Sequence, residues 1–401
     1  MKTAAKFVGG ITAGVVFVAG IFWWAIGPDF RALLLDPPSD TRILFWSQGQ
    51  RNAAFKMLDK LPFLVESRNI TPSNKPKALP TTSPIILDEN MDDFFSEQNL
   101  AGALILHKGK IAYERYALGH SPNKRWTSFS VAKSFTSSLV GIALKEGHIQ
   151  SLDDKVSTYI DGLQGSAYDA VSIEQLLTMT SGVDWNESYT DPNSDVSLFN
   201  LHQAEEGLPT IVSYMRTLKR AHPPGEKWHY STGETNLIGI LVEQATGQNL
   251  TNYLSEKIWQ PYGMENKATW LLGADGKEIS GCCIQASLRD FARYGLFMLE
   301  EGLLNGKGIL PEGWVTKATS KQADFDSPGR GYGYQWWTFD DGSYTARGIF
   351  GQTIFIDPKR DLVIAFNGNW PSATNAKLNR KRFAFIDKVR EAIAPLQAQA
   401  M

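Results

Sequence analysis

The strongest indication of the fold is the stretch SVAKSFTSSLVGIALK, which runs from Ser130 to Lys145. Its apolar side chains recur at spacings of three and four residues, which is the repeat of one helical face. Gly147 stands where such a helix is expected to end. We therefore predict a helix over residues 130–145. On this helix Ser130 and Lys133 share one face, because they lie three residues apart.

The segments on both sides of this helix predict strands near the two ends of the chain. Residues 101–106 and 111–116 are short apolar runs around a Gly-containing loop, the pattern of a β-hairpin. The remaining elements are expected as helices at 173–179, 236–245, 287–301 and 376–394, and as strands at 333–337, 351–356 and 362–366. The simplest assembly is an α+β fold, with one antiparallel sheet built from both ends of the chain, flanked by helices, and an all-helical lobe inserted between them.

This assembly divides the chain into three parts. We expect a membrane anchor at 1–28, a connecting arm at 29–85, and a main domain at 86–401 whose helical lobe covers roughly 148–275. Turn-forming residues are frequent in the arm, above all over 71–84, and residues 55–61 have helical spacing of apolar side chains.

The expected anchor is the uncharged stretch from Phe7 to Ile26, which is long enough to cross a bilayer as a helix. Lys2 and Lys6 precede it and Asp29 follows it, which favours an amino terminus on the inner side. We therefore expect a single-pass membrane protein with its main domain on the extracytoplasmic (periplasmic) side. A cleaved signal peptide is the alternative, and a buried soluble helix is a third reading.

The composition excludes some classes of function. The formal net charge of -2 argues against a general nucleic-acid-binding protein, which needs a basic surface. The six histidines do not cluster at ligand spacing, so no metal site is expected. Cys282 and Cys283 are adjacent, and neighbouring residues rarely meet disulfide geometry. We expect two small buried side chains there, with a reactive thiol as the alternative.

The most informative motif is the Ser-x-x-Lys formed by Ser130 and Lys133. A serine hydroxyl is a weak nucleophile until a base removes its proton. Lysine serves as that base only where burial or nearby positive charge lowers its pKa from about 10.4. The alternative is a helix-capping serine with an exposed lysine. A second match, Ser121 to Lys124, lies in a polar loop with an internal proline, and we expect no catalytic role for it.

Tyr230 is the second candidate residue. It lies in the run WHYSTG at 228–233, before a predicted helix. A tyrosine placed near a lysine relays a proton between nucleophile and leaving group. The alternative is a tyrosine packed between two parts of the fold. His229 is a competing base, which we rank lower because Lys133 already adjoins the serine.

The run ARGIFGQ at 346–352 is the third candidate. Its glycines allow close approach of the backbone to a substrate. A backbone N–H in this run, together with that of Ser130, would form an oxyanion hole. The alternative is a glycine-containing strand without a catalytic role. No Gly-x-Ser-x-Gly elbow occurs, which argues against a different serine hydrolase architecture.

These elements in this order resemble the serine β-lactamase and penicillin-binding superfamily. Within it the chain is most similar to the 6-aminohexanoate-dimer hydrolases, the nylon-oligomer hydrolases. The resemblance covers residues 86–401 and rests on five blocks: SVAKS at 130–134, NESYTDP at 186–192, Tyr230, GIFGQ at 348–352 and NWP at 369–371.

The resemblance implies a role for each candidate. Ser130 is acylated, Lys133 takes its proton, and Tyr230 helps to pass that proton to the leaving group. The N–H groups of Ser130 and Ile349 hold the oxyanion. A water then hydrolyses the acyl-enzyme, and neither a metal nor an organic cofactor is implied.

Substrate contacts are expected from Tyr189, Arg347, Gln352 and Trp336. Tyr189 matches a substrate-contacting tyrosine on a mobile loop of the nylon-oligomer hydrolases. Trp336, with Trp185 and Trp337, is expected to line an apolar pocket for a linear acyl chain. Packing in an aromatic core is the alternative for these tryptophans.

The chain departs from the superfamily pattern at three places. Tyr230-Ser231-Thr232 lacks the Asn of the usual Tyr-x-Asn, and Ala346-Arg347-Gly348 replaces the usual Lys-Thr-Gly. Phe350 stands where the nylon-oligomer hydrolases have a His. The replaced groups commonly bind the carboxylate of β-lactams and cell-wall peptides, and Arg347 is a candidate substitute. Efficient β-lactam hydrolysis is therefore not expected.

The leading hypothesis is a serine hydrolase, an amidase or esterase, that acts on small amides or esters through an acyl-serine. A penicillin-binding D,D-peptidase or weak β-lactamase is the second hypothesis, and it suits the outer face of a membrane. The third, of another class, is a catalytically inactive binding protein with the same fold. The presence of both Ser130 and Lys133 argues against it.

Overall fold

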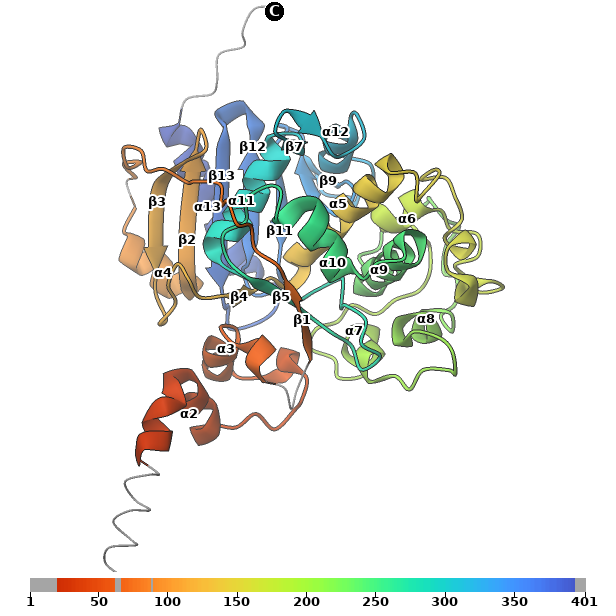
Figure 1. Ribbon diagram of the computed structural model, residues 1–401, viewed down its shortest axis with the longest axis horizontal. Coiled ribbons are helices and arrows are strands. Elements are labelled where there is room, and N and C mark those ends of the chain that lie inside the picture. The colour runs from red at the N-terminus through yellow and green to blue at the C-terminus, as the bar shows by residue number, and fades with distance from the viewer. Residues whose placement is uncertain (1–19, 62–65, 88, 394–401) are drawn as a thin grey trace, which may run out of the picture.

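The computed structural model describes residues 20–61, 66–87 and 89–393, and a seven-stranded antiparallel sheet lies at its centre (Figure 1). The order of strands is β3-β2-β13-β12-β11-β10-β9. The strands are β2 (Leu100–His107), β3 (Lys110–Tyr116), β9 (Arg330–Tyr332), β10 (Trp337–Phe339), β11 (Tyr344–Arg347), β12 (Thr353–Asp357) and β13 (Leu362–Gly368). β2 pairs with β13, so that Leu104 lies opposite Ala365. The prediction of a sheet built from both ends of the chain is confirmed.

Helices cover both faces of this sheet. Successive side chains of a strand point to opposite faces. Ile105 packs in the cluster beneath α4 (Met91–Gln98) and α13 (Ala376–Ala392), whereas Leu104 packs in the larger cluster with α11 (Leu288–Leu299). Because both faces are covered, β2 is buried along nearly its whole length and is a continuous apolar run in the sequence.

A helical lobe lies beside the sheet (Figure 1). Its helices are α5 (Ala132–Lys145), α6 (Ile173–Leu177), α7 (Asp195–Leu198), α8 (Thr210–Met215), α9 (Thr232–Thr246) and α10 (Leu250–Leu254). α5 and α9 pack against each other and are buried along most of their length. The Ser231 hydroxyl caps α9 by accepting a hydrogen bond from the Glu234 N–H, so α9 begins at Thr232, four residues before the predicted start.

A second antiparallel sheet, which the sequence did not predict, joins one strand of the arm to three strands of the rest of the chain. Its order is β1-β5-β6-β4, with β1 (Ser67–Ile70), β5 (Ala268–Leu271), β6 (Ile284–Ala286) and β4 (Trp126–Thr127). β4 ends three residues before Ser130. This sheet therefore determines where the chain enters the turn that carries Ser130.

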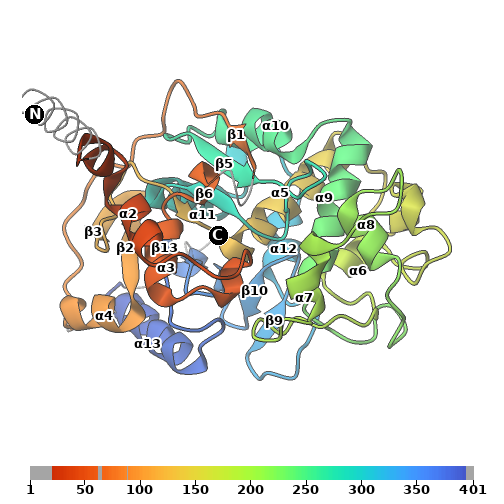
Figure 2. The same cartoon turned by 90° about the horizontal axis from the view of Figure 1, so that it is seen from below.

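The arm is packed against the main body through α2 (Gly27–Leu35) and α3 (Gln48–Ala54) (Figure 2). The buried Arg51 guanidinium donates to the Asn369 side chain and the Trp370 carbonyl, each at 2.9 Å. The Phe55 ring lies 5.6 Å from the Trp126 ring. The block Asn369-Trp370-Pro371 thus forms part of the surface against which the arm packs. The helical spacing of apolar residues at 55–61 does not correspond to a long helix, because α3 ends at Ala54 and only a short 3-10 turn follows at Leu58–Lys60.

The predicted strand at 333–337 is also wrong. The chain bends there, with Gln335 at a φ of 64°, and strands flank the bend on either side. The Gln335 amide donates to the Leu177 carbonyl at 2.9 Å and accepts from the Thr235 hydroxyl at 2.7 Å. These contacts with the helical lobe outweigh the local preference of the aromatic run for a strand.

Two further predictions concern the cysteines and the amino terminus. Cys282 and Cys283 are joined by a disulfide, contrary to the prediction; the turn before β6, where Cys283 has a φ of 83°, brings the two side chains together. Most of the predicted anchor, Phe7 to Ile26, lies outside the described residues. Within residues 20–61, 66–87 and 89–393, no helix is both long enough and apolar enough to cross a membrane.

Candidate active site

Ser130 lies in a 3-10 turn, Phe129–Val131, that leads directly into α5. Phe129 has a φ of 43°, a left-handed conformation that costs on the order of 1–3 kcal/mol for a bulky residue. Its ring packs 5.1 Å from the rings of both Phe55 and Phe350. Aromatic packing from the arm and from the carboxyl-terminal part therefore holds the strained residue that precedes Ser130.

Lys133 lies on the first turn of α5 and is 1% exposed. Its Nζ donates to the Thr232 hydroxyl and to the Gly281 carbonyl, each at 3.0 Å. Burial lowers the pKa of Lys133 to about 8, while the charge of Glu187 acts in the opposite direction. The amine is therefore much closer to deprotonation at neutral pH than an exposed lysine.

Tyr230 lies beside this amine, with the centre of its ring 5.3 Å from Lys133 Nζ. Burial raises the pKa of Tyr230 strongly, the charge of Glu187 raises it further, and a hydrogen bond with Ser130 opposes both effects. Tyr230 is therefore a neutral phenol beside Ser130. The competing base, His229, has its Nε2 bound to the Trp185 carbonyl at 2.6 Å.

The turn that follows β11 approaches the segment before Ser130. A Cβ on Gly348 would lie 2.7 Å from the Ser128 carbonyl oxygen, so only glycine allows this approach. Ile349 comes next, and its N–H has no hydrogen-bond partner in the part of the chain that the structure describes. Gln352 holds this turn against β13. Its side-chain amide accepts a hydrogen bond from the Phe350 N–H at 3.2 Å and donates one to the Gly368 carbonyl at 3.1 Å.

Arg347, at the end of β11, lies on the Tyr230 side of the site. Its guanidinium sits 3.8 Å from the centre of the Trp337 ring, and that ring stacks on Tyr230 at 5.6 Å. Burial lowers the pKa of Arg347 to about 9, and its Nε has no hydrogen-bond partner among the described residues. An anionic group on a ligand would satisfy this cation.

The structure does not bring all the predicted residues to the same place. Ser130, Lys133 and Tyr230 lie together, and Arg347 and Tyr189 border them. Trp336 instead is buried in the core, 5.2 Å from the Tyr344 ring. Gln352 is engaged with the backbone of Phe350 in its own turn and of Gly368 in β13. The second Ser-x-x-Lys match lies elsewhere, with Lys124 donating to the Gly119 carbonyl at 2.7 Å.

No cluster of three or more His, Cys, Asp or Glu side chains suited to a metal ion occurs among residues 20–61, 66–87 and 89–393. The groups that surround Ser130 are an amine, a phenol, a guanidinium and backbone amides. Such a set suits acyl transfer, because it supplies a nucleophile, a base and donors for a developing oxyanion.

A family model described as Beta-lactamase matches residues 87–385. The chain belongs to the β-lactamase family. It is 30% identical over 352 residues, 81% of this chain and 87% of the relative, to the 6-aminohexanoate-dimer hydrolase of Paenarthrobacter ureafaciens. It is 26% identical to a beta-lactamase of Pseudomonas fluorescens, over 45% of this chain and 49% of that one.

Solved structures agree with this β-lactamase-family fold. A Bacillus anthracis protein, provisionally named a 6-aminohexanoate-dimer hydrolase, superimposes with a TM-score of 0.75 at 22% identity, over 85% of this chain and 94% of that one. EstCE1, described as a hydrolase with promiscuous acyltransferase activity, has a TM-score of 0.59 at 16% identity, over 75% of this chain and 95% of that one. The resemblance inferred from the five sequence blocks is confirmed.

Two residues of the site were missed by the comparison with family motifs. Thr232 occupies the third position of the Tyr-x-Asn pattern of the β-lactamase family, and its hydroxyl is the group that accepts from Lys133. The Glu187 carboxylate accepts from the Thr232 N–H at 2.8 Å, from the Thr232 hydroxyl, and from the Tyr189 hydroxyl at 2.7 Å. The position of Thr232, two residues after Tyr230, could have indicated its place in the site. For Glu187 the sequence offers no indication beyond its membership of the block at 186–192.

Proposed function

We propose that this protein is a serine hydrolase that cleaves small amide or ester substrates through an acyl intermediate on Ser130. The observation that carries the proposal is the buried Lys133 amine, whose pKa is lowered to about 8 and which lies one helical turn from the serine. The two hydrogen bonds that its Nζ donates go to neutral oxygens. A neutral amine has two N–H groups for these bonds and one lone pair left to accept a proton.

In the proposed reaction, Lys133 takes the hydroxyl proton as the Ser130 oxygen attacks the carbonyl carbon of the substrate. The N–H groups of Ser130 and Ile349 stabilise the negative charge that develops on the carbonyl oxygen. Tyr230 passes the proton from Lys133 to the departing amine or alcohol, which leaves the acyl group on Ser130. A water molecule then attacks the acyl carbon, its proton passes back through Lys133, and the free acid and the serine hydroxyl are released.

The substrate is proposed to carry a carboxylate that pairs with Arg347. Arg347 is half-buried, its guanidinium lies against the Trp337 ring, and its buried Nε has no hydrogen-bond partner among the described residues, so a ligand carboxylate would complete its contacts. Tyr189 adjoins Tyr230 from the loop at 186–192 and is proposed to contact the acyl chain. The relative from Paenarthrobacter ureafaciens, named for an amide dimer that ends in a carboxylate, supports this substrate class.

A penicillin-binding D,D-peptidase or weak β-lactamase is the second candidate function. It is favoured by the same Arg347, a cation at the middle position of the strand motif that usually binds the carboxylate of such substrates. Stable labelling by a fluorescent penicillin, lost in Ser130→Ala, would support it. The absence of Lys-Thr-Gly at 346–348 argues against it.

The nucleophile is tested by labelling with a fluorophosphonate probe. Wild type and Ser121→Ala, which alters the second Ser-x-x-Lys match, should label equally, and Ser130→Ala should not label. A panel of p-nitrophenyl esters, nitrocefin and linear amides then distinguishes esterase, β-lactamase and amidase activity. Label that persists on Ser130→Ala would refute the assignment, and loss of label without any hydrolysis of the panel would favour an inactive binding protein.

We also propose that the uncharged stretch from Phe7 to Ile26 anchors the protein in a membrane, with the hydrolase domain on the extracytoplasmic side. The support is the length of this stretch and the lysines before it. The protein should stay in membranes washed with alkaline carbonate, and Val15→Asp/Val16→Asp should release it. An amino terminus that begins after Gly20 in the purified protein would instead show a cleaved signal peptide.

A further inference from the structure

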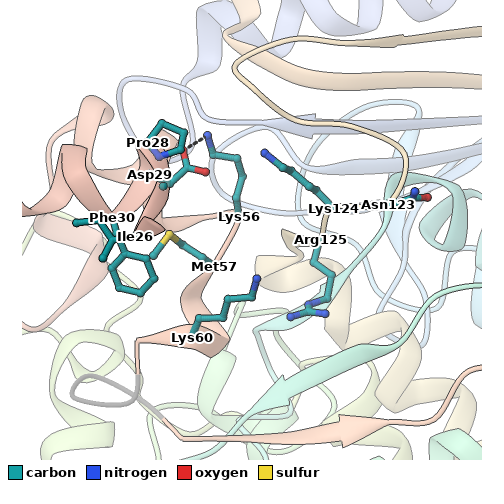
Figure 3. A pocket seen from close by; sticks show the side chains of 11 residues that line it. Ile26, Pro28, Asp29, Phe30, Lys56, Met57, Lys60, Asn123, Lys124 and Arg125 are labelled. Atoms are coloured by element: carbon teal, nitrogen blue, oxygen red, sulfur yellow. Dashed lines mark ion pairs between the residues drawn. The ribbon is translucent and has the colours of Figure 1, made fainter. Parts of the chain in front are cut away.

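A cavity of about 270 Å³ lies between the arm and the loop at 123–125 (Figure 3). None of the residues of the candidate active site line it. The arm contributes the start of α2 and the segment from Lys56 to Lys60, and the loop contributes Lys124 and Arg125. At about 30 Å³ for each water molecule in the liquid, this space has room for a phosphate group and the glycerol attached to it.

Four cations and one carboxylate line this cavity, and only two of the cations are neutralised. Lys56 pairs with Asp29 at 2.5 Å, and Arg125 pairs with Asp59. Lys60 has no ion-pair partner in the part of the chain that the structure describes. Lys124 donates only to the Gly119 carbonyl there. Figure 3 shows Lys60 extending into this space from the arm and Lys124 from the opposite loop.

Apolar side chains surround the same end of the molecule. Phe22 is 65% exposed and Trp24 is 79% exposed, and Ile21 and Trp23 are also exposed. On α2, Leu33 is buried against the arm cluster, whereas the neighbouring Leu34 and Leu35 are exposed. Figure 1 shows that α2 lies at an extremity of the molecule, away from the helical lobe. Exposed tryptophans next to cations are typical of segments that lie at the level of lipid head groups.

We propose that this cavity binds the phosphate head group of an anionic phospholipid while the exposed apolar side chains of residues 21–24 enter the bilayer interface. Lys60 and Lys124 supply the charge that the phosphate requires. Ile26, Phe30 and Met57 form the apolar part of the wall, which suits the glycerol and upper acyl chain of a lipid better than a free phosphate ion. Bound in this way, the lipid fixes the arm, and through the arm the main domain, at one orientation to the membrane.

The test uses the full-length protein in a neutral detergent, with lipid binding measured by native mass spectrometry. Phosphatidylglycerol should bind at least tenfold more tightly than phosphatidylcholine, and inorganic phosphate should not displace it. Lys60→Ala/Lys124→Ala should weaken phosphatidylglycerol binding about 25-fold, because each cation near a lipid surface contributes about fivefold. Lys317→Ala/Lys377→Ala, which removes two exposed lysines elsewhere, is the matched control and should bind like wild type.

Because the uncharged segment at 7–26 is present in every variant, the readout is preference for a head group rather than attachment to a membrane. Hydrolysis of a p-nitrophenyl ester by each variant checks the fold and is expected to stay unchanged. Equal affinity of Lys60→Ala/Lys124→Ala and wild type for phosphatidylglycerol would overturn the proposal. So would equal binding of the two lipids, or full displacement of the lipid by inorganic phosphate, which would indicate a site for small anions.

Discussion

The Lys133 amine donates to the Thr232 hydroxyl at 3.0 Å, and the nearest carboxylate, that of Glu187, accepts from Thr232 rather than from the lysine. An ion pair with Glu187 would hold the proton on the amine. The intervening hydroxyl keeps the carboxylate one hydrogen bond away, so burial prevails and the pKa of Lys133 falls to about 8. An amine with this pKa is available to act as a base near neutral pH.

This arrangement predicts the pH dependence of hydrolysis. The amine must be deprotonated to act, so kcat/KM for a p-nitrophenyl ester should rise with pH and level off above an apparent pKa of about 8. The rate is measured from about pH 6 to about pH 9.5, with Ser130→Ala subtracted as the background. A rate that falls over this range would contradict a role for Lys133 as the base.

Glu187→Gln should move that pH profile. The charge of Glu187 raises the pKa of Lys133, so its removal lowers this pKa and shifts the acid limb of kcat/KM to lower pH. A glutamine keeps an acceptor for the Thr232 N–H. Glu205→Gln, at an exposed carboxylate that pairs with Arg216, is the control and should leave the midpoint unchanged. A purely structural role for Glu187 would reduce the rate without moving the midpoint.

Gly348→Ala should damage the proposed oxyanion hole without unfolding the protein. The added Cβ would lie 2.5 Å from the Gln352 side chain and 2.7 Å from the Ser128 carbonyl, so the turn that carries Ile349 must move away from Ser130. Loss of one oxyanion donor lowers kcat by roughly 10²- to 10³-fold. Gly49→Ala, where a Cβ meets only the Ser47 hydroxyl at 3.9 Å, should retain full activity. Equal kcat values for the two variants would exclude this role of the turn.

Arg347→Gln should slow the hydrolysis of substrates that carry a carboxylate and leave the hydrolysis of neutral substrates nearly unchanged. Removing one partner of a charge-assisted contact costs about 1.5–3 kcal/mol, which corresponds to a roughly 10- to 100-fold loss in kcat/KM for a linear amide with a terminal carboxylate. Hydrolysis of a neutral p-nitrophenyl ester should change little, since no carboxylate is involved. A parallel loss for both substrates would show that Arg347 supports the structure around Tyr230 instead.

The large features of this fold were accessible from the sequence because local patterns encode them. The long apolar run at 130–145 and the strands at both ends of the chain have the right periodicity, and the three-residue spacing of Ser130 and Lys133 is itself local. The second sheet was missed because its strands are two to four residues long and lie far apart in the chain. The bend at Gln335 was missed because its cause is a set of hydrogen bonds to the helical lobe.

Some residues of the candidate site could likewise be predicted from local sequence patterns, and others could not. Ser130, Lys133 and Tyr230 belong to short motifs that a single sequence reveals. The contact between Glu187 and Thr232 joins residues 45 positions apart, and no spacing rule predicts it. Trp336 and Trp337 are neighbours of the same type, and the sequence alone does not show that Trp337 stacks on Tyr230 while Trp336 packs in the core.

The contact of Phe55 with Phe129 has a practical consequence for work with shortened forms of this protein. A form cut back to the start of the family match at residue 87 would lack Arg51, Phe55 and β1. It would expose the ring of Phe129, the residue immediately before Ser130. Such a form is expected to be poorly active even when it is well expressed. Removal of the uncharged stretch that we propose as an anchor should therefore stop ahead of α2, so that the whole arm stays packed against Phe129 and the turn that carries Ser130.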